Sequence, residues 1–150
     1  RQTVAGLKVQ SLSEEITAAS QALESAGIDL RREGSAWSDL DSISAVNQAV
    51  FAWVIREATT NIIRHAAARR ATIKLDRSSL TITDNGVGIS PEAAGHGLEG
   101  LKARVEQVGG TLSIVGKRGA ASTASTTGTA STASERQNAL ETGTVVEVKL

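Results

Sequence analysis

The chain of 150 residues is long enough for a single domain with a substantial hydrophobic core. Its 16 Lys and Arg residues balance 16 Asp and Glu residues, which argues against a protein held on nucleic acid or an anionic membrane by net charge. The sequence contains no cysteine, which excludes disulfides and thiolate chemistry, and two histidines leave little room for a histidine-rich metal site. It starts at Arg1 and contains no methionine, so we expect it to be a piece of a longer protein.

The first half of the chain predicts two helices with a short strand between them. Residues 11–26 carry apolar side chains at helical spacing, and Ser11 or Ser13 is suited to cap the first turn. Residues 28–33 predict a short strand, and residues 43–67 predict a long helix.

The second half predicts four further strands and a third helix. The strands are expected at 71–75, 80–84, 111–115 and 144–150, and the helix at 98–108. Residues 120–134 contain only Ala, Ser, Thr and Gly, so we expect 116–143 to form a long solvated loop inserted in the last hairpin. This order of elements predicts a two-layer α/β sandwich with a mixed, mainly antiparallel sheet.

One face of the long helix changes from apolar to polar halfway along. An apolar stripe of Ile43, Val46, Val50, Trp53 and Val54 is continued in the same direction by Glu57, Asn61, Arg64 and His65. A second apolar stripe, which is expected to keep the whole helix packed, contains Phe51, Ile55, Ala58 and Ile62. Burying the polar groups together is costly unless a ligand binds them. The alternative is that the helix leaves the core and these groups meet solvent.

Asp84 favours the ligand hypothesis. Period-two alternation places it on the same face as the apolar residues of its strand, so its side chain is expected to point inward. Asp-Asn-Gly is also a common tight-turn sequence, but the residues after Gly86 do not alternate as the second strand of a hairpin would. A carboxylate followed by Gly86 and Gly88 suits a pocket where the backbone approaches a ligand closely.

A glycine-rich segment opens the predicted third helix. Free N–H groups at the start of a helix, preceded by glycines such as Gly95 and Gly97, form a site suited to phosphate. His96 has no visible partner, and we interpret it as a lid residue rather than a metal ligand or a base. A buried acceptor for an amino group, an asparagine for a cation and N–H groups for phosphates together indicate an ATP–Mg²⁺ pocket. The sequence lacks the Gly-x-x-x-x-Gly-Lys pattern, so the pocket is not a P-loop.

Three motifs resemble the nucleotide-binding boxes of one ATPase superfamily, which contains gyrase, the ninety-kilodalton heat-shock chaperones, histidine kinases and mismatch-repair ATPases. The segments similar to its N, G1 and G2 boxes are residues 56–65, 84–89 and 95–101. The chain most resembles sensor histidine kinases of the DesK and nitrate-sensor group in its Glu-x-x-x-Asn-x-x-x-His spacing, its short lid over residues 90–94, and the pair Leu101 and Arg104 after the G2 box. This resemblance covers residues 11–150 apart from the Ser/Thr/Ala loop and implies the Bergerat fold.

The resemblance implies a role for each matching residue. Asn61 resembles the Mg²⁺ ligand, Asp84 the group that accepts from the adenine amine, and Thr144 a further contact near adenine. Glu57 matches a residue that orients the metal shell or, in the ATPase branches, acts as a general base, and in a kinase we expect the first role. The full implied ATP-binding set is Asn61, Arg64, His65, Asp84, Gly86, Gly88, Ile89, Gly95, His96, Gly97, Leu98 and Thr144.

The resemblance also implies an activity, with ATP and Mg²⁺ as cofactors. It is transfer of the γ-phosphoryl group to a histidine on a separate dimerisation domain. No histidine precedes His65, so residues 1–10 are expected to be the helical tail of that dimerisation region, residues 11–150 the catalytic domain, and no self-phosphorylation is expected. The implied partners are the phosphoacceptor domain of the parent kinase and, through it, a response regulator, with no nucleic acid and no direct membrane contact. The implied location is the cytoplasm, in a membrane-anchored parent.

Two alternatives to the histidine kinase stay open. One is a regulatory kinase that phosphorylates serine on an anti-sigma antagonist, which shares this pocket. The other is a non-catalytic nucleotide-binding interaction module, against which the intact Asn61, Asp84 and glycines argue. The Ala/Ser/Thr-rich insertion after Lys117 and Arg118 departs from the family pattern.

Overall fold

The computed structural model describes residues 3–4, 7–8, 11–87, 96–117 and 143–150. The helices among them are α1 (Leu12–Ser25), η1 (Ala36–Ser38), η2 (Leu40–Ser42), α2 (Ala45–Asn61), the π-helix η3 (Ile62–Ala66) and α3 (His96–Gln107). The strands are β1 (Thr3–Val4), β2 (Leu7–Lys8), β3 (Asp29–Glu33), β4 (Arg70–Leu75), β5 (Ser79–Asp84), β6 (Thr111–Lys117) and β7 (Gly143–Lys149). The predictions for Gly88, Ile89, Gly95 and residues 118–142 lie outside the described residues.

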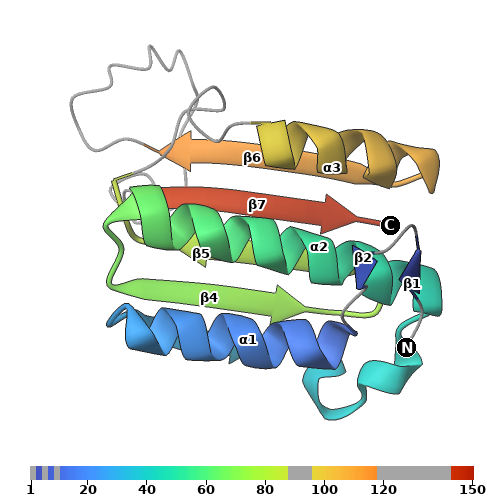
Figure 1. Cartoon of the computed structure of the whole chain (residues 1–150), viewed down its shortest axis with the longest axis horizontal. Helices are drawn as coiled ribbons and strands as arrows, with labels where there is room; N and C mark the ends of the chain where they lie inside the picture. The colour runs from blue at the N-terminus through green and yellow to red at the C-terminus, as the bar shows by residue number, and fades with distance from the viewer. Residues whose placement is uncertain (1–2, 5–6, 9–10, 88–95, 118–142) are drawn as a thin grey trace, which may run out of the picture.

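Five strands form one mixed sheet in the order β3-β4-β5-β7-β6. Strands β3 and β4 are parallel, and the other neighbouring pairs are antiparallel. Helices α1, α2 and α3 lie side by side over one face of this sheet (Figure 1). The prediction of a two-layer α/β sandwich with a mainly antiparallel sheet is therefore confirmed.

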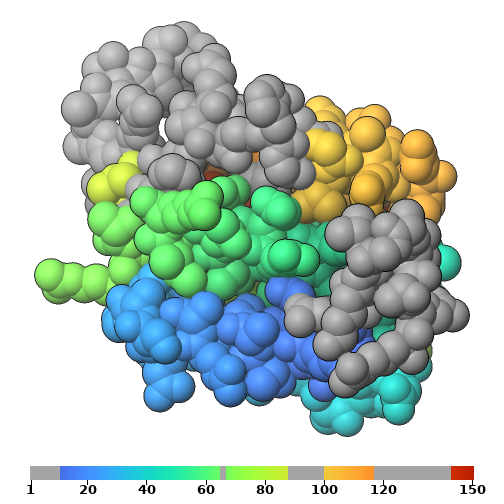
Figure 2. Space-filling view, in the orientation of Figure 1, coloured from blue at the N-terminus to red at the C-terminus, as the bar shows by residue number. Residues whose placement is uncertain are grey.

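Helix α1 forms as its sequence predicts. Ser11 caps it by accepting a hydrogen bond from the Glu14 backbone N–H at 3.1 Å, which settles the choice between two possible capping serines. The four apolar residues at helical spacing, Leu12, Ile16, Ala19 and Leu23, are all buried. Gly27 follows the last turn with a φ of 75°, a conformation that glycine adopts without strain. Figure 2 shows α1 and α2 packed along each other on the helical face.

Helix α2 is packed mainly through one of its two predicted apolar stripes. The side chains of this stripe, Phe51, Ile55, Ala58 and Ile62, are each at most 4% exposed. The other stripe lies along the margin of the core, so its burial is uneven: Val50 and Val54 are buried, Trp53 is half-buried and Val46 is 55% exposed. The prediction that Val46 faces the core was therefore wrong, because the core-facing arc is centred on the neighbouring stripe.

Strands β4 and β5 form a hairpin that places β5 at the centre of the sheet. The Asp76 N–H donates to the Ser79 carbonyl oxygen at 2.9 Å and closes the predicted tight turn. Alternate side chains of both strands are buried beneath the helices, as period-two alternation predicts. On the opposite face the sheet carries partly exposed Thr72, Thr81 and Thr83.

Strand β6 is two residues longer than predicted, and β7 begins and ends one residue earlier than predicted. Lys117 pairs with Gly143 in the ladder, so the predicted loop at 116–143 was too long at both ends, where backbone pairing continues into Gly116, Lys117 and Gly143. These positions show no alternation of apolar and polar side chains, so the sequence did not predict them as strand. Backbone pairing between β6 and β7 nevertheless continues through them.

The N-terminal residues show a feature that the sequence did not predict. Strands β1 and β2 form a short antiparallel pair, with Thr3 opposite Lys8 and Val4 opposite Leu7. The described residues within 1–10 are therefore extended rather than helical, and the N-terminal helix of the domain is α1. No helix within the described ranges combines the length and apolarity that crossing a membrane requires.

Candidate nucleotide-binding site

Asp84 ends the central strand of the sheet, and its side chain points inward as predicted. It is 5% exposed, and it pairs with Ala71 of β4 on one side and with Thr144 of β7 on the other. Its Oδ1 accepts a hydrogen bond from the Gly86 N–H at 2.9 Å. Burial raises the pKa of the Asp84 carboxyl, and hydrogen bonds from the backbone of Gly86 and Thr144 oppose this rise.

Asn85 anchors the end of β5 to the start of β4. Its side-chain Oδ1 accepts from the backbone N–H groups of Arg69 at 2.9 Å and of Arg70 at 2.8 Å, and its own N–H donates to the Arg70 carbonyl oxygen at 3.2 Å. Asp-Asn-Gly therefore forms an anchored strand end. Because β5 already lies between β4 and β7, the motif does not open a hairpin, as the lack of alternation after Gly86 predicts. Sequence reasoning missed Asn85, although the tendency of Asn to bind backbone N–H groups near turns is a usable signal.

Gly143 lets β7 start directly beside Asp84. Its φ is 140°, and a Cβ at this position would overlap the carbonyl oxygen of Asp84. The next residue, Thr144, is buried and lies opposite Asp84 in the β5–β7 ladder. Sheet pairing thus joins Asp84 to a threonine that is 60 positions away in the sequence.

Asn61 is the last residue of α2 and carries an unsatisfied polar atom. Its Nδ2 is buried and has no hydrogen-bond partner among the described residues. A buried polar atom without a partner costs free energy, which points to a ligand group at this position. Rotation of the amide exchanges Oδ1 and Nδ2, so the same position can present an oxygen to a cation or an N–H to a phosphate.

Glu57 lies one helical turn before Asn61 and is half-buried. No group of three or more His, Asp or Glu residues in the described part of the chain could hold a metal ion by itself. A cation bound near Asn61 would take further oxygen ligands from water or from a phosphate group, as Mg²⁺ in phosphate sites commonly does.

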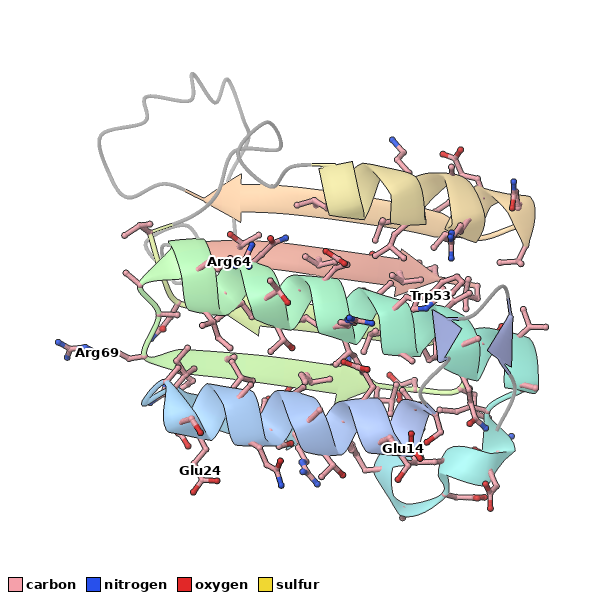
Figure 3. The ribbon with its side chains drawn as sticks, in the orientation of Figure 1. Glu14, Glu24, Trp53, Arg64 and Arg69 are labelled. Carbon is pink, nitrogen blue, oxygen red and sulfur yellow. The ribbon has the colours of Figure 1, made fainter. Side chains whose placement is uncertain are left out.

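After Asn61 the helix widens into the π-helix η3, where the sequence predicted a continuous α-helix to residue 67. Short π-helical segments occur often at functional sites. Ala67 ends the segment with a left-handed φ of 47°, which turns the chain toward β4. Arg64 is exposed at this end of the helix on the side of β7, whereas Arg69 points away from the domain (Figure 3). For His65 the structure describes only the backbone, in η3.

Helix α3 begins at His96, two residues before its predicted start, so His96, Gly97 and Leu98 form its first turn. The first N–H groups of a helix have no partner within it and can bind an anion. Helix α3 runs antiparallel to α2, so its N-terminus and the Asn61 end of α2 point to the same side of the domain (Figure 1). The structure thus brings Asp84 and Thr144 together in the sheet, with Gly86 bonded to Asp84 just beyond the strand end and Asn61 on the helix packed above β5.

Known proteins similar to this chain are sensor histidine kinases. Sensor histidine kinase DesK of Bacillus subtilis (strain 168) is 28% identical over 130 residues, which cover 82% of this chain and 35% of DesK. Sensor histidine kinase YvfT of the same organism is 30% identical over 119 residues, which cover 76% of this chain and 32% of YvfT. This chain therefore spans about a third of the length of these relatives.

Solved structures with the same fold include the histidine kinase AdeS of Acinetobacter baumannii, with a TM-score of 0.57 at 14% identity over 97% of this chain and 68% of that chain. The histidine kinase domain of the blue-light activated histidine kinase of Erythrobacter litoralis EL346 gives a TM-score of 0.54 at 16% identity, covering 100% of this chain and 65% of that chain. Identities this low establish the fold alone.

The family model described as histidine kinase-, DNA gyrase B-, and HSP90-like ATPase matches residues 47–150. This range holds the end of β5, the Asn61 end of α2, the start of α3 and β7. The sequence motifs, the fold and this match agree, and the chain belongs to the family of histidine kinase-, DNA gyrase B- and HSP90-like ATPases.

Proposed function

We propose that this chain is the ATP–Mg²⁺-binding catalytic domain of a two-component sensor histidine kinase. The observation that carries the proposal is the buried carboxyl of Asp84 at the end of the central strand, beside Gly86 and Thr144. A buried acceptor at this position selects a ligand with an exposed amino group, which adenine has and guanine lacks at the same ring position. Together with the family match, this arrangement supports an adenine nucleotide as the ligand.

The residues on the helices are suited to the phosphate end of the same nucleotide. The N–H groups in the first turn of α3 favour the negative charge of phosphate oxygens, and Arg64 supplies a cation at the end of α2. Residues His65, Gly88, Ile89 and Gly95 belong to the proposed set through the family motif. In this proposal the domain binds ATP between the sheet and the helical layer. The γ-phosphate then faces the domain that carries the phosphoacceptor histidine.

The side chains at this end of α2 fit a Mg²⁺ site. Asn61 offers an amide with an unsatisfied buried atom, and Glu57 lies one turn away, where it can orient the water molecules of the ion. Asn61 would hold the ion together with phosphate oxygens, and the ion would neutralise charge on the transferred group. The residues of this chain then act by positioning: Asp84 fixes the base, and Asn61 and α3 fix the phosphates.

The acceptor is proposed to lie on another domain. The two histidines of the sequence, His65 and His96, both belong to the nucleotide-binding motifs. The similar proteins are named sensor histidine kinases and are about two and a half times as long as this chain. The proposed partner is therefore a dimerisation domain of the parent protein, which carries the phosphoacceptor histidine. A response regulator is proposed to receive the phosphoryl group from that domain.

Phosphoryl transfer between separate domains tests this proposal. The chain is incubated with γ-labelled ATP and Mg²⁺, alone and with the dimerisation domain of its parent. We expect acid-labile, base-stable label on the histidine of the added domain and essentially none on the chain itself. Asn61→Asp should reduce the transfer at least tenfold by disturbing the metal shell, whereas Asn47→Asp, at the other end of the same helix, should leave it unchanged.

The two other functions give different results in this experiment. Label on a serine of an anti-sigma antagonist would favour the serine kinase. ATP binding without transfer to any added partner would favour a non-catalytic module. Absence of ATP binding by the folded wild-type chain would contradict the nucleotide site itself.

A further inference from the structure

Arg104 of α3 stacks on Trp53 of α2. The guanidinium carbon lies 4.0 Å from the centroid of the Trp53 ring, within the range of a cation–π interaction. Trp53 is half-buried, and Arg104 is exposed, so the ring is held by the core while the guanidinium covers its outer face. Figure 3 shows Trp53 on the α3 side of α2.

Hydrophobic packing attaches α3 to the core through other residues. Leu101 and Val105 are 6% and 0% exposed, and they hold α3 against the body of the domain. Arg104 lies beside this stripe on the flank of α3 that faces α2. Its contact with Trp53 is therefore an additional link between two helices that are otherwise joined at their core-facing sides.

The stacked pair lies about as many helical turns from Asn61, along α2, as from the first turn of α3, along α3. Trp53 precedes Asn61 by about two helical turns, and Arg104 follows His96 by about two turns. Because the helices are antiparallel, both intervals run toward the same side of the domain (Figure 1). A shift of α3 along α2 would therefore change the separation between Asn61 and the first turn of α3.

We propose that Trp53 and Arg104 form a clamp that fixes α3 relative to α2, and that both act as positioning residues for the phosphates of the nucleotide. This inference rests on the proposed function, because it assigns the phosphates to Asn61 and the start of α3. The adenine position depends on Asp84, which belongs to the sheet and not to either helix. The clamp thus acts on ATP–Mg²⁺ affinity and leaves adenosine affinity unchanged.

Arg104→Gln tests the clamp with little risk to folding, since Arg104 is exposed. Calorimetry measures the dissociation constant for ATP–Mg²⁺, NMR titration measures that for adenosine, and thermal unfolding checks stability. We expect ATP–Mg²⁺ to bind about three- to tenfold more weakly and adenosine to bind as in the wild type. Trp53→Leu should give a similar loss, and the double variant should lose no more than either single variant.

The chain offers a matched control in a second stacked pair. The guanidinium carbon of Arg32 lies 5.0 Å from the ring centroid of Trp37, on the β3 side of the domain. Arg32→Gln removes a comparable contact without touching α2 or α3, and it should leave both affinities unchanged.

The possible outcomes separate the clamp from the proposed function. Equal weakening of ATP–Mg²⁺ and adenosine in Arg104→Gln, or unchanged ATP–Mg²⁺ affinity, would overturn the clamp. Additive losses in the double variant would show that the two residues act separately, which also overturns it. A wild-type chain that binds adenosine but not ATP–Mg²⁺ would contradict the proposed function before any variant is compared.

Discussion

Asp84 occupies a position that disfavours its own charge. Burial raises the pKa of its carboxyl, and two backbone N–H groups compensate only in part. Because ionisation of this buried carboxyl opposes folding, Asp84 is a candidate for ligand binding. At the scale of single residues, Asp84 and the unsatisfied amide of Asn61 are the two observations that mark the site.

The first prediction concerns nucleotide selection by Asp84. Asp84→Asn replaces an oxygen acceptor by an amide that can also present an N–H group toward the adenine amine. We expect ATP affinity to fall at least tenfold, about 1.4 kcal/mol, in calorimetry. Asp29→Asn, at an exposed position on β3, should change nothing. Equal affinity of the wild type for ATP and GTP would contradict the role of Asp84 in reading the base.

The second prediction concerns the pH dependence of stability. Because the folded state raises the Asp84 pKa above the ordinary value of 3.8, the folded protein holds this proton more strongly than the unfolded chain. The resulting stabilisation is complete below the unfolded pKa and is lost as the pH rises through the raised pKa. Asp84→Asn should therefore gain stability relative to the wild type as the pH rises, in urea unfolding from about pH 4 to pH 8.

Asp76 provides the control with the opposite sign. Hydrogen bonds from the Ser35 backbone N–H and hydroxyl, both 2.9 Å from Oδ1, lower the pKa of Asp76 below 3.8. Its stabilisation is present above the unfolded pKa and is lost as the pH falls through the lowered pKa. Asp76→Asn should thus be less stable than the wild type at neutral pH, with a difference that shrinks in acid. A stability difference from the wild type that changes with pH in the same direction for both variants would refute at least one of the two assignments.

At the scale of secondary-structure elements, the site depends on how strand ends are held together. Asn85 joins the end of β5 to the start of β4, and Gly143 permits β7 to approach Asp84. Asn85 follows Asp84 directly in the sequence, and Gly143 directly precedes Thr144. The Asp-Asn-Gly motif therefore combines Asp84, which is proposed to bind the ligand, with Asn85, which holds the sheet together.

The third prediction tests the anchor made by Asn85. Asn85→Ala leaves the N–H groups of Arg69 and Arg70 without their shared acceptor, and should lower the free energy of unfolding by about 1–2 kcal/mol. Asn85→Asp keeps an acceptor oxygen at the same position and should remain within about 0.5 kcal/mol of the wild type. Urea unfolding measures both. An alanine variant as stable as the wild type would show that the two hydrogen bonds contribute nothing to the sheet.

At the scale of the whole molecule, the sheet is completed by a strand that follows a long insertion. Strand β7 inserts between β5 and β6, and it lies beside the site through Thr144. The ladder between β6 and β7 extends to the pair Lys117 and Gly143. The backbone at this point is therefore already in the geometry of a hairpin end.

The fourth prediction follows from this pairing. Replacing residues 118–142 by Asn-Gly, the preferred two-residue hairpin turn, should preserve the fold and nucleotide binding. Closing a shorter loop costs less entropy, by about 0.6 kcal/mol for each halving, so stability should be equal or higher. Circular dichroism and thermal unfolding measure the result. A melting temperature many degrees lower would mean that the replaced segment is a packed part of the domain.

The sequence alone predicts the three α-helices and the five strands of the main sheet. Helical spacing in α1 and period-two alternation in β4 and β5 are local properties, because a side chain's direction follows from its backbone conformation. The same local logic correctly turns Asp84 inward. Each family motif is a continuous stretch of sequence, so it can be recognised without the structure. Together the motifs indicate an ATP-binding domain, and the family match agrees with them.

Other features are decided only by the tertiary structure. Val46 is exposed because neighbouring elements determine which arc of α2 faces the core, and the helical period gives only the arc's width. The hydrogen bonds of Asn85, the pairing of Asp84 with Thr144 and the stacking of Arg104 on Trp53 each join residues far apart in the chain. Such contacts depend on sheet order and helix packing. These are set by the packing of the helices and strands against one another as a whole, so no local sequence pattern contains them.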